Sequence, residues 1–263
     1  MFSIEIECLP ERMDLAIAEL WEAGAGGIVE LSDTRLRAFF EDEWDRGALI
    51  GQFHPVSWRQ EEERDWVAAS QADWEPILVG ERFFLVPEWR SDPAPDGRFR
   101  IAVNPGMAFG TGRHETTQLC LEALEKYVRP GMRMLDVGTG SGILAQAAAL
   151  LGAEPVWACD IDPEAVAIAR GNAGANVFVG SADAVRAAAA GVIAANISPE
   201  AIVWLAPDLL RCLCAGGVAL LSGFNGWEVP AVAAGLEGGR VLETRYKGDW
   251  ALLVVGDKLD GGV

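Results

Sequence analysis

The sequence contains few histidines and cysteines and no long uninterrupted apolar run. Two histidines and five cysteines occur in 263 residues, and the cysteines have neither zinc-site nor disulfide-framework spacing. We therefore expect no metal site and expect the cysteines to be core residues in a reducing compartment. No apolar run reaches the ~18 residues of a membrane span, and two glutamates near the start argue against a signal peptide. These absences predict a cytoplasmic chain without a membrane partner.

Basic residues are also scarce, with 21 Lys and Arg against 39 Asp and Glu, for a net charge of -18. The imbalance is uneven, because residues 1–90 carry 8 basic and 20 acidic side chains and residues 91–263 carry 13 and 19. Such a surface disfavours nucleic acid and favours a basic protein partner. Solubility alone is the alternative explanation for this charge.

Residues 1–60 predict a small α+β domain. Apolar residues alternate with Glu5 and Glu7, as in a half-buried strand, and a helix over 13–23 follows with apolar residues near helical spacing. Short strands are expected over 28–31 and 36–40, which gives the β-α-β-β start of a ferredoxin-like fold. Residues 61–95 are expected to form a linker helix running to about residue 72 and a connecting segment with a strand over 83–86.

From residue 96 onward the pattern predicts an α/β domain ending near residue 257. After a strand over 99–103, strands and helices alternate as in a doubly wound, Rossmann-like sheet. Seven strands are expected at 132–137, 156–160, 176–179, 192–195, 217–222, 240–246 and 250–255, the last two as a hairpin. Helices are expected at 115–128, 143–151, 163–171, 199–214 and 227–234, with a short alanine-rich helix near 182–190. We expect the chain to be a monomer.

A glycine turn connects the first of these strands to the following helix. Glycines at 138, 140 and 142 follow Asp136, so the backbone can pass close to a ligand and the helix amides can face it. The dinucleotide fingerprint would need a third glycine at position 143, where Ile143 stands. A tight turn without a ligand is the alternative. An acidic residue followed by this glycine spacing resembles the first motif of S-adenosylmethionine methyltransferases.

Asp160 ends the next predicted strand, 22 residues after Gly138. A carboxylate there is placed to accept hydrogen bonds from ribose hydroxyls. Asp162 precedes Pro163 and is the better candidate for the helix cap. We therefore expect Asp160 to be free for the ligand.

Residues 104–117 (NPGMAFGTGRHETT) form a glycine-rich run that ends in hydroxyl residues at a helix start. The run is typical of a loop that closes over a ligand, with Thr117 pointing inward. A plain glycine-rich loop with a threonine cap is the alternative. His114, in this run, is interpreted as a surface-loop residue rather than a general base.

These motifs together resemble the PrmA family, which methylates protein eleven of the large ribosomal subunit. The similarity covers the 104–117 loop, the Asp136–Gly142 turn, Asp160–Pro163, Ala195–Ile197 and the glycines near 216 and 223. It implies S-adenosylmethionine as cofactor, with contacts at Thr117, Gly138, Asp160 and Asn196. Neighbouring motif residues complete the candidate cofactor site: Asp136, Gly140, Phe109 and Gly110. Asn196 is the candidate catalytic residue, orienting the acceptor amine.

The resemblance implies transfer of methyl groups to lysine ε-amino groups, and to an α-amino group as a second candidate, of a basic large-subunit ribosomal protein. Ser198 stands where the family usually has a bulky residue. Other acceptors therefore stay open: another protein lysine or a small molecule. A non-catalytic cofactor-binding adaptor and a nicotinamide-dependent oxidoreductase are rival functions from other classes.

Overall fold

The computed structural model describes the chain except residues 1, 10–11, 33, 42–46, 48–52, 54, 61–74, 105–111, 173 and 258–263. It divides into two compact units, Met1–Trp74 and Glu75–Val263. The expected linker helix lies outside the described residues. The domain limits expected at residues 60 and 95 stay predictions.

The first unit contains a four-stranded antiparallel sheet with the order β2-β3-β1-β4. The elements are β1 (Phe2–Glu7), α1 (Met13–Glu22), β2 (Gly27–Ser32), β3 (Arg35–Phe40) and β4 (Ser57–Gln60). Apolar residues that alternate along β1 and β3 are buried together with Leu20 of α1. This strand order is that of a ferredoxin-like fold, so the predicted class is confirmed.

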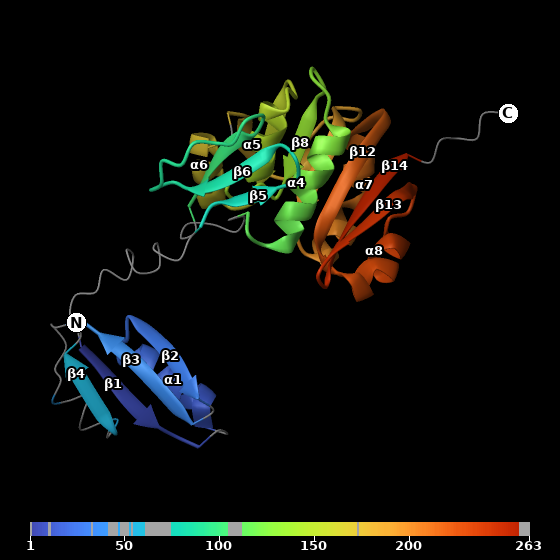
Figure 1. Cartoon of the computed structure of the whole chain (residues 1–263). Coiled ribbons are helices and arrows are strands. Elements are labelled where there is room, and N and C mark those ends of the chain that lie inside the picture. Colours follow the sequence, from blue (N-terminus) through green and yellow to red (C-terminus); the bar gives the residue numbers. More distant parts are fainter. Residues whose placement is uncertain are drawn as a thin grey trace. The chain divides into compact units, whose positions relative to one another are not determined.

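The second unit is built on the predicted seven-stranded sheet, whose order is β10-β9-β8-β11-β12-β14-β13 (Figure 1). The strands are β8 (Met134–Val137), β9 (Val156–Asp160), β10 (Asn176–Val179), β11 (Ala190–Asn196), β12 (Leu213–Asn225), β13 (Gly239–Lys247) and β14 (Trp250–Asp257). The first five are parallel, while β14 runs antiparallel to β12 and forms a hairpin with β13. The strand order reverses between β8 and β11, and such a switch point opens a crevice for a ligand.

The strands of this sheet are apolar on both sides, so both faces of the sheet are buried under other elements. One face packs against α4 and α5 and a small sheet of order β5-β6-β7, and the other against α7 and α8 (Figure 1). The further elements are α4 (Glu115–Tyr127), α5 (Ile143–Leu150), α6 (Pro163–Asn172), α7 (Pro199–Cys212), α8 (Val229–Gly235), β5 (Ile77–Val79), β6 (Phe83–Pro87) and β7 (Phe99–Val103). None of the described helices is long and apolar enough to cross a bilayer.

The predicted alanine-rich helix at 182–190 is wrong. Only a 3-10 turn, Ala182–Ala184, forms there, and Ala188 adopts a φ of 51°. The amides of Ala188 and Ala189 donate to carbonyls at the end of α7 at 3.0 and 2.8 Å. These tertiary hydrogen bonds hold the segment as a connection into β11, and they override the helix propensity of alanine.

Two glycines of β12 predict different responses to the same substitution. Both have positive φ, 104° at Gly223 and 75° at Gly216. A Cβ at Gly223 would collide with the backbone carbonyl of Ile197, whereas nothing lies within 4 Å of one at Gly216. We expect Gly223→Ala to destabilise the unit by about 3 kcal/mol or more, and Gly216→Ala by about 1 kcal/mol, because only the first adds a clash to the backbone strain. Urea unfolding measures both, and equal losses would contradict this account of Gly223.

Candidate functional site

A cavity of about 670 Å³ opens where β8, β9 and β11 end. Its volume falls in the range of small-molecule sites. Its lining residues are His114, Thr116, Val137, Gly138, Gly140, Asp160, Ile161, Gly180, Ser181, Asn196, Ile197, Ser198, Ala201, Trp204, Leu205, Gly223 and Trp250. Asp160 is the one Asp, Glu, Lys or Arg among them, so the wall carries a negative charge in mostly apolar surroundings.

The glycine turn forms one wall of this cavity. Glycines 138, 140 and 142 have φ values of 70°, 52° and 83°, which side chains disfavour. The amides of Gly138 and Thr139 donate to the carbonyl of Cys159 at 2.9 and 3.0 Å, which ties the turn to β9. A Cβ on Gly138 would collide with the Ile197 side chain. The glycines therefore serve the packing of the turn against Ile197 and β9.

Asp160 is less free than the sequence suggested. Its Oδ2 accepts the amide of Gly140 and its Oδ1 accepts the amide of Asp162, both at 3.0 Å. Asp162 does cap α6, because its Oδ1 accepts the amide of Glu164 at 2.9 Å. Each carboxylate oxygen of Asp160 keeps a further lone pair that can accept a hydroxyl. The carboxylate thus fixes the turn and also faces the cavity.

Asp136 does not line the cavity and is fully buried beneath the turn. Its Oδ2 accepts the hydroxyl of Thr139 at 2.7 Å and the amide of Ala145 at 3.2 Å, whereas its Oδ1 has no hydrogen-bond partner among the described residues. The pKa of this carboxyl is raised to about 6, mainly by burial and to a smaller extent by the Asp160 charge, against the lowering effect of those two hydrogen bonds. Asp136 therefore connects the turn to α5 from below.

Asn196 and Thr117 come together from distant parts of the chain. Nδ2 of Asn196 donates to Oγ1 of Thr117 at 3.3 Å. Asn196 ends β11 and lines the cavity, while Thr117 is buried behind it in α4. Among the described residues, none donates a hydrogen bond to Oδ1 of Asn196, so this oxygen remains available to a ligand.

The interpretation of His114 as a surface-loop residue is wrong. It is the half-buried N-cap of α4, with Nδ1 at 2.8 Å from Oγ1 of Thr116. Its ring meets Trp250 edge-on, with the centroids 4.5 Å apart. Both rings line the cavity. Sequence reasoning missed Trp250 because it lies 136 positions further along the chain, at the start of β14.

Ile161 and Trp204 were also missed. They are 79% and 76% exposed although both line the cavity. A ligand that covers large apolar side chains removes their surface from water, which makes its binding more favourable. Ile161 directly follows Asp160 at the end of β9, and this position was the sequence signal that could have placed Ile161 in the cavity.

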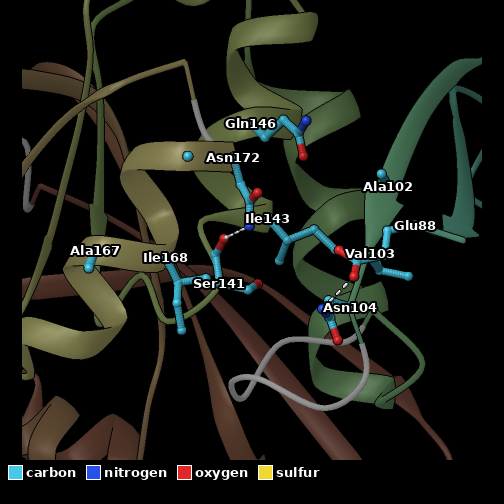
Figure 2. A pocket seen from close by; sticks show the side chains of 11 residues that line it. Glu88, Ala102, Val103, Asn104, Ser141, Ile143, Gln146, Ala167, Ile168 and Asn172 are labelled. Carbon is cyan, nitrogen blue, oxygen red and sulfur yellow. Dashed lines mark hydrogen bonds between the residues drawn. The ribbon is translucent and has the colours of Figure 1, made fainter. Parts of the chain in front are cut away.

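A smaller cavity of about 400 Å³ is lined by Ser141 of the glycine turn and by residues of α5, α6 and β7 (Figure 2). Nδ2 of Asn172 donates to the carbonyl of Ser141 at 3.2 Å, and Nδ2 of Asn104 donates to Oε1 of Glu88 at 2.7 Å. These contacts hold the turn and the start of the 104–117 loop. Phe109 and Gly110 lie outside the described residues, and the part of the chain that is described contains no cluster of possible metal ligands.

The chain resembles known proteins over most of its length. Residues 29–258 match the family model of ribosomal protein L11 methyltransferase (PrmA). The chain belongs to this family. The relative from Symbiobacterium thermophilum is 43% identical over 211 residues, covering 77% of this chain and 69% of its own. The relative from Gloeobacter violaceus is 42% identical over 238 residues, covering 83% and 74%. Both carry the name ribosomal protein L11 methyltransferase.

A solved structure supports the same assignment. The ribosomal protein L11 methylase of Lactobacillus delbrueckii subsp. bulgaricus is 31% identical, with a TM-score of 0.64, and the match covers 70% of this chain and all of that one. The chain is therefore a Rossmann-like, S-adenosylmethionine-dependent methyltransferase. Its cavity fits this cofactor in size, in the carboxylate of Asp160 and in the exposed apolar side chain of Ile161.

The buried carboxyl of Asp136 predicts a pH dependence of stability. Its pKa of about 6 in the folded chain exceeds the ordinary 3.8, so folding favours the protonated form. That stabilisation is complete below pH ~4 and is lost as the pH rises through 6, which amounts to about 2 to 3 kcal/mol. Asp136→Asn removes the titration. The unfolding free energy of the variant minus that of the wild type should therefore rise by this amount between pH 4 and pH 7.5 in urea unfolding. A difference that stays flat would contradict the buried, unpaired carboxyl.

Proposed function

We propose that this chain transfers methyl groups from S-adenosylmethionine to lysine ε-amino groups of ribosomal protein L11, with an α-amino group as a second candidate acceptor. The observation that carries the proposal is the family match over residues 29–258. The cavity supports it, because Asp160, the proposed ribose acceptor, and Asn196, the proposed amine acceptor, both line it.

Three parts of the cavity are proposed to hold the cofactor. Asp160 would accept hydrogen bonds from the ribose hydroxyls, and Ile161 would cover the purine. Gly138 and Gly140 would let the backbone approach the methionine part without a Cβ clash. When bound, S-adenosylmethionine supplies a methyl group that is already electrophilic, so the protein's task is to position the acceptor and to desolvate it.

Asn196 is proposed to orient the acceptor amine. A lysine amine with a pKa of ~10.4 is less than ~0.1% neutral at pH 7, and only the neutral amine carries the lone pair that attacks. The apolar walls formed by Ile197 and Trp250 would lower that pKa by desolvation. Oδ1 of Asn196 would accept an amine N–H and direct the lone pair toward the methyl group. Thr117 would hold the Asn196 amide in this orientation through the 3.3 Å hydrogen bond.

The acidic first unit is proposed to recognise the substrate. Residues 1–74, which form this unit, carry 17 acidic side chains against 6 basic ones. This charge would steer a basic protein toward the enzyme, and it disfavours nucleic acid as a direct partner. A cytoplasmic, monomeric enzyme without a membrane partner is part of the same proposal.

Transfer from radiolabelled S-adenosylmethionine to purified L11 tests the function. The full chain should label L11 but not L11 whose amines have been acetylated beforehand, and mass spectrometry then locates the methylated residues. A cytoplasmic extract serves as the second substrate. Label in another protein or in a small molecule, with none in L11, would overturn the acceptor. Cofactor binding without any methyl transfer would instead indicate a non-catalytic adaptor that binds the cofactor.

Asn196→Ala should lower kcat for L11 about 100-fold, because the amine loses its orienting acceptor. Thr117→Val is the matched variant, since it removes only the group that holds Asn196 and should therefore lower kcat less. Both are measured by initial rates at saturating cofactor. A wild-type kcat in Asn196→Ala would exclude the proposed orienting role.

Asp160→Ala should weaken binding of S-adenosylhomocysteine by about 10- to 100-fold, because hydrogen bonds to a charged acceptor contribute ~1.5–3 kcal/mol each. Asp162→Ala is the control two residues away. It removes the cap of α6 and should cost about 1 kcal/mol of stability while leaving the affinity near that of the wild type. Calorimetric titration measures both affinities. An affinity of Asp160→Ala equal to that of the wild type would refute the assignment of Asp160 to the ribose.

A further inference from the structure

A third cavity lies at the opposite edge of the main sheet from the cofactor cavity. It has a volume of about 570 Å³ and is lined near the starts of β8, β9 and β11. Its apolar walls include Trp157, which is 46% exposed, together with Phe178 and Pro155. A cavity of this size with a half-exposed indole can enclose a flat aromatic ring.

Two arginines, Arg133 and Arg186, also line this cavity, and its lining includes no Asp or Glu. Neither guanidinium forms a hydrogen bond or an ion pair with any described residue. By contrast, the guanidinium of Arg211 bonds the carboxylate of Asp208 at 2.8 Å and the carbonyl of Val185 at 2.7 Å. In a chain of net charge -18, two unpaired arginines at one cavity indicate a site for an anion.

The backbone on both sides of this cavity is held in place. The carbonyl of Arg133 accepts the amides of Gly191 and Val192 at 2.8 and 3.2 Å. Val185, next to Arg186, has its carbonyl bonded by Arg211. The two guanidiniums are therefore carried by a fixed frame, which reduces the entropy lost when they bind a ligand.

We propose that this cavity binds a nucleoside monophosphate, a ligand that joins a flat aromatic base to a phosphate. The base would pack against Trp157 and Phe178. The phosphate would bind the guanidiniums of Arg133 and Arg186, whose planar donor groups match phosphate oxygens. This inference concerns a site separate from the methyl-transfer cavity and does not depend on the identity of the acceptor.

Phe178 lies close to a residue that lines the cofactor cavity. Its ring lies 3.3 Å from the position that a Cβ on Gly180 would take, and Gly180 lines the cofactor cavity. Phe178 itself lines only the cavity with the arginines. A nucleotide could still bind in the cofactor cavity through its base, so that cavity has to be filled during a binding test.

The test is calorimetric titration of the full chain, saturated with S-adenosylhomocysteine, with guanosine 5′-monophosphate. We expect saturable binding, at least tenfold weaker binding of guanosine, which lacks the phosphate, and at least tenfold weaker binding of inorganic phosphate, which lacks the base. The double variant Arg133→Gln and Arg186→Gln should reduce the affinity for the nucleotide at least tenfold.

Arg240→Gln is the matched control, because Arg240 of β13 is exposed and its guanidinium also has no partner among the described residues. It should leave the affinity for the nucleotide unchanged. Circular dichroism and the affinity for S-adenosylhomocysteine confirm that each variant is folded. Absence of nucleotide binding to the saturated chain, or equal binding by the double variant and the control, would overturn the proposal.

Discussion

Three of the five residues of the Gly138–Gly142 turn have no side chain, and a carboxylate on each side of the turn holds its conformation. The carboxylate of Asp160 accepts a hydrogen bond from the amide of Gly140 on the cavity side. The carboxylate of Asp136 accepts hydrogen bonds from the hydroxyl of Thr139 and the amide of Ala145 on the buried side. The lower carboxylate is buried without a partner for one of its oxygens, which is unfavourable. This unfavourable burial occurs where the hydrogen bonds of Asp136 connect the end of β8 to the turn and to α5.

The rest of the cavity depends on the same region of the sheet. Because the strand order reverses between β8 and β11, the ends of these neighbouring strands are free to form a crevice. Asn196 enters it from β11, and Trp250 enters it from the antiparallel strand β14. The walls therefore combine one charge, one available amide oxygen and several apolar side chains. Such a combination suits a charged cofactor and an amine that must lose its proton.

Much of the fold could be predicted, because its patterns are local. Apolar strands that carry Asp136 next to their end or Asp160 at their end, and the glycine spacing between strand and helix, appear in consecutive residues. The alanine run at 182–190 misled the prediction, because its backbone bonds to the end of α7 rather than to itself. The two amide donors of Asp160 could not be predicted, since they reach its carboxylate only when the turn is folded against β9.

The sequence by itself determined the fold class, the glycine turn, the family and hence the methyl donor, because each of these follows from residues close together in the chain. Only the tertiary structure decided that Asp136 lies beneath the cavity, that His114 contacts Trp250, and that Arg133 and Arg186 line one cavity. The physical reason is that burial and pairing depend on contacts between strands and helices distant in sequence. Periodicity and motif spacing do not record such contacts.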